Sequence, residues 1–467
     1  MRIEKRGNKK FMPLKKAYNL LLLVFLFLLP WQTRYIWHYG ELNGGFWEYG
    51  TFSIYATEIL LWIILALFFV QHFWKNGFWQ YPSLYPSPKR GGARGWGFGF
   101  ILFLLALALA TVLSNNFWVS YNYAFHILEA MALMTVLAWQ NEKVKFQIAL
   151  WAGGVLQGAL AIWQFLTQNV WVSKWLGMAG QEASNLGPSV IEFADQRWLR
   201  AYGSFGSPNS LGIYLAVLFV LGLVLYLKIE SARIKIAISV GQIFILSGLL
   251  LSFSRGAWIA AAVGTACLGI VVGCHSERSK AKSKNPLNIK QEGSFIRQDE
   301  FRMTVTADLL KQLIFVAVTV IFWLIIFYPV FTARFNLNNR LESKSISERK
   351  GQYAEALYFI KTNPIFGIGP GAYTYVLYKK YPNLPSWQYQ PIHNIYLLAL
   401  VEIGLAGVIF LFFLFKRLFW LMVKNNLLYT PIIITLALAG IFDHWLWSMY
   451  AGIVLFWLIV GLGFSKE

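Results

Sequence analysis

Residues 209–228 read NSLGIYLAVLFVLGLVLYLK, a stretch in which Lys228 is the only charged side chain. An α-helix of about 20 residues, at ~1.5 Å per residue, spans the ~30 Å hydrocarbon core of a bilayer. Eleven further apolar blocks of this kind occur, at approximately 17–36, 54–73, 96–114, 119–140, 146–167, 235–252, 257–273, 313–333, 394–415, 428–442 and 447–464. Since lipid offers no hydrogen-bond partner to a backbone, each block predicts a helix. The predicted fold class is an all-α, polytopic integral membrane protein with about 12 transmembrane helices.

The composition of the 467 residues agrees with this class. Hydrophobic residues make up 57%, aromatic residues 18% and charged residues 13%, against roughly 25% charged in a soluble domain. A net charge of +20 would suggest a nucleic-acid partner in a soluble protein, but the repeated apolar blocks exclude that class. The two cysteines, Cys267 and Cys274, lie two turns apart on one predicted helix, too far for a disulfide. No disulfide framework is therefore expected.

The Lys and Arg residues are spread unevenly over the segments between the blocks. If the N-terminal segment lies inside, about 28 of the 41 basic residues fall on the inner side and about 13 on the outer side. Short loops rich in Lys and Arg stay on the cytoplasmic side of the membrane. The sequence thus predicts that both termini are cytoplasmic, and most of the net charge is an orientation signal.

Three segments are too long to be simple connections within what is expected to be a single membrane domain, residues 1–467. Residues 274–312 are polar and aperiodic and predict a disordered cytoplasmic insert. Residues 168–208 and 334–392 are predicted outer loops, rich in Trp, Tyr, Gly and Pro. Long ordered loops are where functional residues concentrate, so the second of these, which we expect to be partly helical, is the main place to look.

Two arginines are candidates for binding an anion on the outer side. Arg255 ends a predicted span and is followed by Gly256; it is either an interfacial arginine that reaches lipid headgroups or a guanidinium clamp for a phosphate. Arg349 follows the pair Ser345 and Glu348, which predicts a capping box and a helix running to residue 362. A cation in the first helical turn is unfavourable unless an anion binds there. A screened surface pair is the alternative.

Other outer residues add to this picture. The run Pro364 to Tyr373 holds three glycines, but no preceding strand or Lys-Ser/Thr pair, so it predicts a packed turn and not a nucleotide loop. His393 opens the tenth span at its outer end, where it is either structural or a titrating group. Arg200 lies on a third outer segment that leads into a span.

Four acidic residues fall within or at the ends of predicted spans: Glu58, Glu129, Glu402 and Asp443. A carboxylate in lipid is costly unless it is paired or faces a cavity. No two of them share a span at helical spacing. The pair Asp443 and His444 is expected to form a solvated turn between the last two spans.

Taken together, the outer motifs resemble the O-antigen ligase/O-antigen polymerase superfamily. The resemblance covers about residues 200–410. It is carried by four segments in order: Arg200 with Gly203-Ser204-Phe205 and Pro208-Asn209, then Ser254-Arg255-Gly256, then Arg349 with Asn363-Pro364-Ile365-Phe366-Gly367-Ile368-Gly369-Pro370-Gly371, then His393-Asn394 with Glu402-Ile403-Gly404. Each motif alone is weak, and their order makes the set fairly specific.

The resemblance implies a membrane glycosyltransferase that acts on the outer side of the bacterial cytoplasmic membrane, without a cofactor or a metal. Its donor would be a glycan on undecaprenyl pyrophosphate, and its acceptor a lipid, a glycan or a protein. By the family pattern Arg255 and Arg349, and more weakly Arg200, would bind the pyrophosphate, and His393 would act as the base. The motifs favour a ligase, with a polymerase or a protein O-oligosaccharyltransferase as alternatives. A polysaccharide or lipid transporter or flippase, a class that places its polar residues near the membrane midplane, and a structural scaffold are the other readings.

Overall fold

The computed structural model describes residues 12–76, 94–140, 142–193, 196–283, 292–336 and 340–464. It is mostly helical, at 73%. The long helices are α2 (Met12–Leu28), α3 (Ala56–Asn76), α4 (Arg94–Val112), α5 (Phe117–Ala138), α6 (Lys143–Thr167), α7 (Pro208–Lys228), α8 (Ala232–Leu251), α9 (Arg255–Ser283), α10 (Glu292–Ile326), α12 (Arg340–Thr362), α14 (Ile395–Asn425), α15 (Thr430–Phe442) and α17 (Tyr450–Gly463). Shorter helices are α11 (Tyr328–Phe335), α13 (Tyr373–Lys380) and α16 (Trp445–Ser448).

Every apolar block predicted from the sequence overlaps one of these helices. Six helices in the described part of the chain are long and apolar enough to cross a membrane: α6, α7, α8, α14 and the apolar parts of α9 and α10. The protein is therefore a helical integral membrane protein, and the count of 12 spans and their orientation stay predictions. The first block ends early, because the chain turns at Pro30 and continues as a strand from Arg34 to His38.

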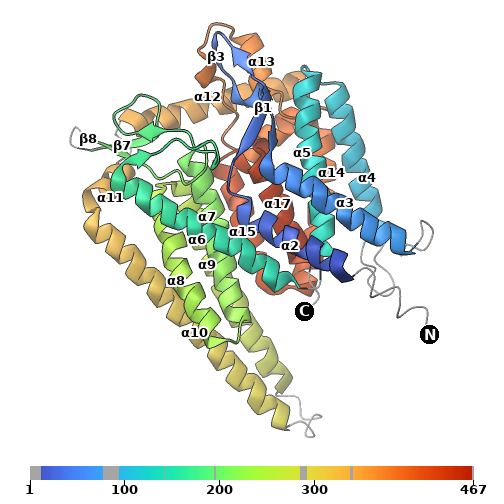
Figure 1. The fold of residues 1–467 in the computed structure, drawn as a ribbon, viewed down its shortest axis with the longest axis vertical. Helices are drawn as coiled ribbons and strands as arrows, with labels where there is room; N and C mark the ends of the chain where they lie inside the picture. Colours follow the sequence, from blue (N-terminus) through green and yellow to red (C-terminus); the bar gives the residue numbers. More distant parts are fainter. Residues whose placement is uncertain are drawn as a thin grey trace.

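The bundle is organised around α7, of which 94% of the apolar window is buried inside the protein. Around it α6 packs on α8, α15 on α9, α17 on α5 and α14 on α4 (Figure 1). A helix that is apolar on all its faces is suited both to lipid and to such a buried position in the protein. This explains why the sequence of α7 is one continuous apolar run. The helices thus form the frame on which the polar loops at one end are held.

Short antiparallel hairpins, which were not predicted, lie in the loops at one end of the bundle. They pair β1 (Arg34–His38) with β4 (Phe52–Tyr55), β2 (Glu41–Leu42) with β3 (Gly45–Phe46), β5 (Asn169–Val170) with β6 (Gln181–Glu182) and β7 (Val190–Phe193) with β8 (Gln196–Leu199). Figure 1 shows β1, β3, β7 and β8 at the same end as α11, α12 and α13, whereas α9 and α10 extend from the opposite end. The aromatic and β-branched residues of these loops favour strands.

The prediction of a disordered insert at 274–312 is wrong where the structure describes it. Helix α9 extends into this segment as far as Ser283, and helix α10 begins within it at Glu292. Residues 284–291 lie outside the described part of the chain. Lys, Ala, Arg and Gln favour helices despite the absence of an apolar period. The end of the segment packs on α8, where Asp308 pairs with Lys235 and Gln312 donates to Ser239 at 2.7 Å.

Helix α14 is broken at Gly404, and the glycine-rich run fills the break. Gly404 has φ 64°, and a Cβ there would lie 2.3 Å from the carbonyl oxygen of Ile365. The amides of Leu405 and Ala406 donate to residues 364 and 365, and the amides of residues 368 and 369 donate to residues 401 and 402, all at 2.9–3.0 Å. The turn predicted from the glycines is present, and its backbone replaces the lost helical hydrogen bonds.

Candidate active site

A cavity of about 1050 Å³ lies at the hairpin end of the bundle. It is lined from the starts of α7 and α9, from α11 and α12, from the segment before α14 and from the turn between α15 and α17. The four site residues predicted from the sequence, Arg200, Arg255, Arg349 and His393, all line it. The structure therefore brings together four segments that lie far apart in the chain.

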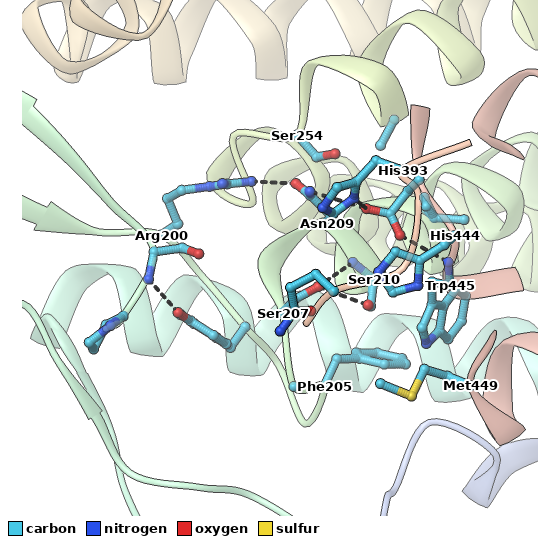
Figure 2. Close-up of a pocket in the computed structure, with 18 of the residues that line it drawn as sticks. Arg200, Phe205, Ser207, Asn209, Ser210, Ser254, His393, His444, Trp445 and Met449 are labelled. Carbon is cyan, nitrogen blue, oxygen red and sulfur yellow. Dashed lines mark hydrogen bonds and ion pairs between the residues drawn. The ribbon is translucent and has the colours of Figure 1, made fainter. Parts of the chain in front are cut away.

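Arg200 is fixed in the wall of this cavity (Figure 2). It lies in the loop between β8 and α7, and only 7% of it is exposed. Its Nε donates to the carbonyl oxygen of Ser252 and its Nη2 to Oδ1 of Asn209, both at 2.8 Å. Burial, and the nearby charge of Arg255, lower the pKa of Arg200 to about 10. A buried guanidinium without a carboxylate partner is a favourable position for an anion.

Arg334, on α11, supplies a second guanidinium, on a side chain that is 13% exposed, and the sequence analysis did not single it out. Its Nε donates to the carbonyl oxygen of Phe253 at 3.0 Å, and its Nη1 pairs with Glu342. Phe253 is a fully buried residue with φ 49°, a left-handed conformation that costs about 1–3 kcal/mol and persists only where the surroundings enforce it. That strained turn connects α8 to α9 and carries the acceptor for Arg334.

Arg255 is the first residue of α9 and shares the same carboxylate. Its Nη2 lies 2.5 Å from Oε2 of Glu342, while Arg334 contacts Oε1. Glu342 is buried in the first turn of α12, where a carboxylate is favoured by the helix dipole. One buried acid thus holds two guanidiniums side by side.

Arg349 lies farther along α12, and the predicted capping box is wrong. The helix begins at Arg340 and not near Ser345, because residues 340–344 are good helix formers and Glu342 is anchored by two arginines. The predicted end at Thr362 is confirmed. Among the described residues Arg349 has no hydrogen bond or ion pair, so its guanidinium is available to a ligand in the cavity.

The four arginines together make this part of the cavity strongly positive. Burial, followed by the charges of Arg200, Arg255 and Arg349, lowers the pKa of Arg334 to about 8. Each guanidinium therefore makes a positive charge on its neighbours less favourable. An anion bound among them would reverse this effect, since it would favour all four charged forms at once.

His393 also lines the cavity and lies immediately before α14. Its side chain is 29% exposed, and its Nδ1 is 3.4 Å from Oδ2 of Asp443. Its backbone amide donates to Oε1 of Gln352 at 3.2 Å. A carboxylate at Nδ1 favours the tautomer that carries the proton there, and leaves the Nε2 lone pair free to accept one.

The turn that holds Asp443 and His444 is not solvated, which corrects the prediction. Both residues are buried. Oδ1 of Asp443 accepts from the amide of Trp445 at 2.9 Å, and the two imidazole rings of His393 and His444 lie 5.0 Å apart. Burial alone would raise the pKa of Asp443, but the hydrogen bond with His393 and the adjacent histidines hold that pKa below its usual value. Burial lowers the pKa of His444 to about 4, so it is neutral at pH 7.

A continuous polar chain connects the arginines to the histidine (Figure 2). Nη2 of Arg200 donates to Asn209, Nδ2 of Asn209 donates to Oδ2 of Asp443 at 3.2 Å, and the same oxygen meets His393. Such chains fix the positions of their members relative to each other. The distance between the anion-binding groups and the candidate base is therefore set by packed side chains.

One donor set in the cavity has the composition of a metal site. The ligand atoms of His393, Asp443 and His444 lie within 4.8 Å of one another. Each also has a protein partner, because Nδ1 of His444 is 2.5 Å from Oγ of Ser448 and Asp443 accepts from Trp445. The set could hold a metal ion, or it could orient His393 alone.

Arg334, Glu342, Asn209, Asp443 and His444 were missed as functional residues. An acid and a histidine interrupting an apolar stretch were a visible signal for Asp443 and His444. Nothing in the local pattern marks Arg334 or Glu342, which become significant only because α11 and α12 fold back over the start of α9.

The fold and the cavity define a class: a polytopic helical membrane protein with a basic, histidine-containing pocket at one end. Residues 240–412 match the family model described as O-antigen ligase. Over these residues the chain is similar to this family, which confirms the predicted resemblance to the O-antigen ligase/polymerase superfamily. In general terms its function is of the ligase or polymerase type. No curated protein sequence matches the chain.

The matched segment contains five of the cavity's candidate functional residues, Arg255, Arg334, Glu342, Arg349 and His393. Arg200 and Asp443 lie outside it on either side. They are joined to the domain by the polar chain through Asn209, so the cavity is completed by helices that flank the matched segment.

Proposed function

We propose that this protein transfers a glycan from an undecaprenyl-pyrophosphate carrier to an acceptor hydroxyl, as an O-antigen ligase does. The reaction would take place on the outer side of the bacterial cytoplasmic membrane. The observation that carries the proposal is the joint placement of four arginines and an acid-supported histidine in one cavity. The position of the cavity, away from the basic inner loops, supports the outward orientation.

The arginines would hold the pyrophosphate. Arg255 and Arg334 already bind a carboxylate, Glu342, in a geometry that suits an oxyanion, and Arg349 has no partner among the described residues. When the bond from the anomeric carbon to the phosphate oxygen breaks, its electron pair leaves with the lipid pyrophosphate. Fixed guanidiniums stabilise the charge that develops there. They do so more strongly in a buried site than in water.

His393 would act on the acceptor. The acceptor oxygen attacks the anomeric carbon, and the hydroxyl proton passes to Nε2 of His393. A positioned base of this kind contributes roughly 10²–10⁴-fold to the rate. Asp443 stabilises the imidazolium that forms, as its position at Nδ1 requires. His444, which is neutral at pH 7, adds no competing positive charge.

The transfer is proposed to need no metal. The charge that a metal would supply to the leaving group is provided by the arginines. The donor set of His393, Asp443 and His444 makes this a point to test. Loss of transfer after chelation, in protein that is still folded at the assay temperature, would contradict it.

The central experiment uses purified protein in detergent, a lipid-pyrophosphate-linked glycan and a panel of acceptors. Arg255→Ala, Arg349→Ala and His393→Ala should each abolish transfer while the protein stays folded. Arg340→Ala is the matched control: it lies on the same helix as Arg349, but it is exposed and pairs with Glu192 at 2.7 Å. Full activity in His393→Ala would refute the assignment of the base.

The acceptor that becomes glycosylated separates the related activities. Modification of a lipid core indicates a ligase, extension of a glycan indicates a polymerase, and modification of a protein indicates a protein O-oligosaccharyltransferase. Movement of intact donor across vesicle membranes without any transfer would instead favour a transporter or flippase.

A further inference from the structure

A second polar cluster, separate from the arginine cavity, joins α3 to α5. Glu58 in the first turn of α3 faces His126 and Glu129, which lie three residues apart on one face of α5. Their exposed fractions are 2%, 8% and 5%. The ligand atoms of the three side chains lie within 4.8 Å of one another. We call these three residues the acidic cluster.

Two polar atoms in the acidic cluster are buried without a hydrogen-bond partner among the described residues: Nε2 of His126 and Oε2 of Glu129. The other carboxylate oxygens are engaged, because Oε2 of Glu58 accepts from the amide of Tyr55 at 3.0 Å and Oε1 of Glu129 accepts from Trp62. Oε1 of Glu58 lies 3.7 Å from the free Nε2 of His126. Unsatisfied buried polar atoms are rare and call for an explanation, and here both belong to one three-residue cluster.

Two carboxylates buried next to each other are unfavourable without a positive charge. A divalent ion bound to two carboxylates and one neutral imidazole gives a neutral site. Ligands about 2.0–2.2 Å from a tetrahedral Zn²⁺ lie roughly 3.3–3.6 Å apart. Side-chain rotations that move the ligand atoms by less than about 1 Å would therefore close the site. The imidazole suits Zn²⁺ and the two carboxylates also suit Mn²⁺, whereas Mg²⁺ and Ca²⁺ are bound through oxygen ligands.

A route to the acidic cluster leads from the arginine cavity. A smaller cavity of about 60 Å³ reaches His126, and its wall shares Arg34, Glu48, Tyr55 and Met449 with the large cavity. An ion could therefore arrive from the outer side without crossing lipid.

From this geometry we propose that Glu58, His126 and Glu129 bind one Zn²⁺ or Mn²⁺ ion, which clamps α3 to α5. The role is structural. Glu58 is bonded to the backbone of Tyr55, whose ring stacks on Tyr450 of α17 with centroids 4.6 Å apart. The clamp thus fixes β4 and α17 behind the catalytic cavity. It is independent of the proposed transfer reaction, since it contacts neither the arginines nor His393.

The test measures metal content and thermal stability of the full-length protein, purified in detergent without chelators. Elemental analysis should find about one Zn²⁺ or Mn²⁺ per chain. Removal with EDTA should lower the melting temperature by several degrees, and either ion alone should restore it. His126→Ala and the near-isosteric Glu129→Gln should lose the ion and the response.

His393→Ala serves as the control, because it disrupts the other donor set and should keep the ion. A metal-free wild-type protein that does not respond to added Zn²⁺ or Mn²⁺ would overturn the proposal, and would mean that protons neutralise the acidic cluster. Metal that survives in both cluster variants but disappears from His393→Ala would also overturn it. Neither result depends on whether the protein transfers glycans.

Discussion

The arginine cavity and the acidic cluster have opposite charge and opposite access. The cavity is lined by four guanidiniums, two of which share the buried carboxylate of Glu342, and its volume is about 1050 Å³. In the acidic cluster two carboxylates surround one imidazole, and the adjoining space is about 60 Å³. The first arrangement suits a large anion that enters and leaves, and the second suits a small cation that stays. Charge excess together with volume therefore indicates what kind of ligand each site takes.

The largest expected effect concerns the histidine that faces the large cavity. Asp443→Asn replaces the carboxylate at Nδ1 of His393 with an amide that can no longer stabilise an imidazolium. We expect kcat for transfer to fall by roughly 10²–10³-fold, within the range that a general base contributes. The KM for the donor should change little. Steady-state kinetics with Asp308→Asn, an acid paired with Lys235 at a distant position, provides the comparison.

An unchanged kcat in Asp443→Asn would mean that the buried acid only holds the turn. The environment of His393 in the arginine cavity and that of His126 in the acidic cluster would then no longer differ in function.

The next effect concerns pH and the neutral His444. Its pKa is about 4 in the folded protein and 6.5 when unfolded, so between these values the unfolded state binds more protons. Stability is therefore complete above about pH 6.5 and is lost as the pH falls towards 4, by about 3 kcal/mol in total. His444→Gln should remove this loss. Melting temperatures measured from pH 7 to 4 test it, and equal slopes for both proteins would contradict the assignment.

A smaller effect is expected for donor binding by Arg334. Arg334→Ala removes one of the guanidiniums that contact Glu342, so we expect the KM for the donor to rise by roughly 10–100-fold, as for a lost charge-assisted hydrogen bond. Arg334→Lys should restore only part of the affinity, because an ammonium lacks the planar fork. Donor titration checks both variants against Arg340→Ala. A wild-type KM in Arg334→Ala would restrict the anion site to Arg200, Arg255 and Arg349.

The smallest effect concerns the carboxylate inside the cavity. Glu342→Gln leaves Arg255 and Arg334 without their counter-charge, so the free protein should lose about 1–3 kcal/mol of stability. Added inorganic pyrophosphate should then raise the melting temperature more than it does in the wild-type protein. The matched variant is Glu348→Gln, whose acid is exposed and pairs only loosely with Lys344. Equal responses in both variants would show that Glu342 does not compete with the anion.

The positions of the helices could be predicted well from the sequence, because a continuous apolar run is sufficient to indicate a span. The boundaries that failed are those where polar residues decide. Residues 274–283 and 292–312 are helical without an apolar period, and the start of α12 is set by contacts of Glu342 with two arginines elsewhere in the chain. The hairpins also depend on partners that a local pattern does not contain.

The candidate site was predicted as a set of separate motifs. Arg200, Arg255, Arg349 and His393 could be selected because each lies in a predicted outer loop or at the predicted outer end of a span. The residues that hold them in place could not be selected from the sequence. The contacts of Arg334 with Phe253 and of Asp443 with Asn209 connect residues that are 81 and 234 positions apart. Likewise Glu58 and Glu129 were noted singly, and only the packing of α3 against α5 brings them together.

The break in α14 has a consequence for the biosynthesis of the protein. A helix that enters the bilayer with unpaired amides at residues 405 and 406 would be held back at the interface. The carbonyls that accept from them belong to residues 364 and 365, which leave the ribosome only about forty positions earlier. Residues 363–406 therefore form a unit that can satisfy its own backbone before the last two helices are made. A longer connection between the glycine-rich run and α14 should therefore impair insertion into the membrane before it impairs the structure of the completed protein.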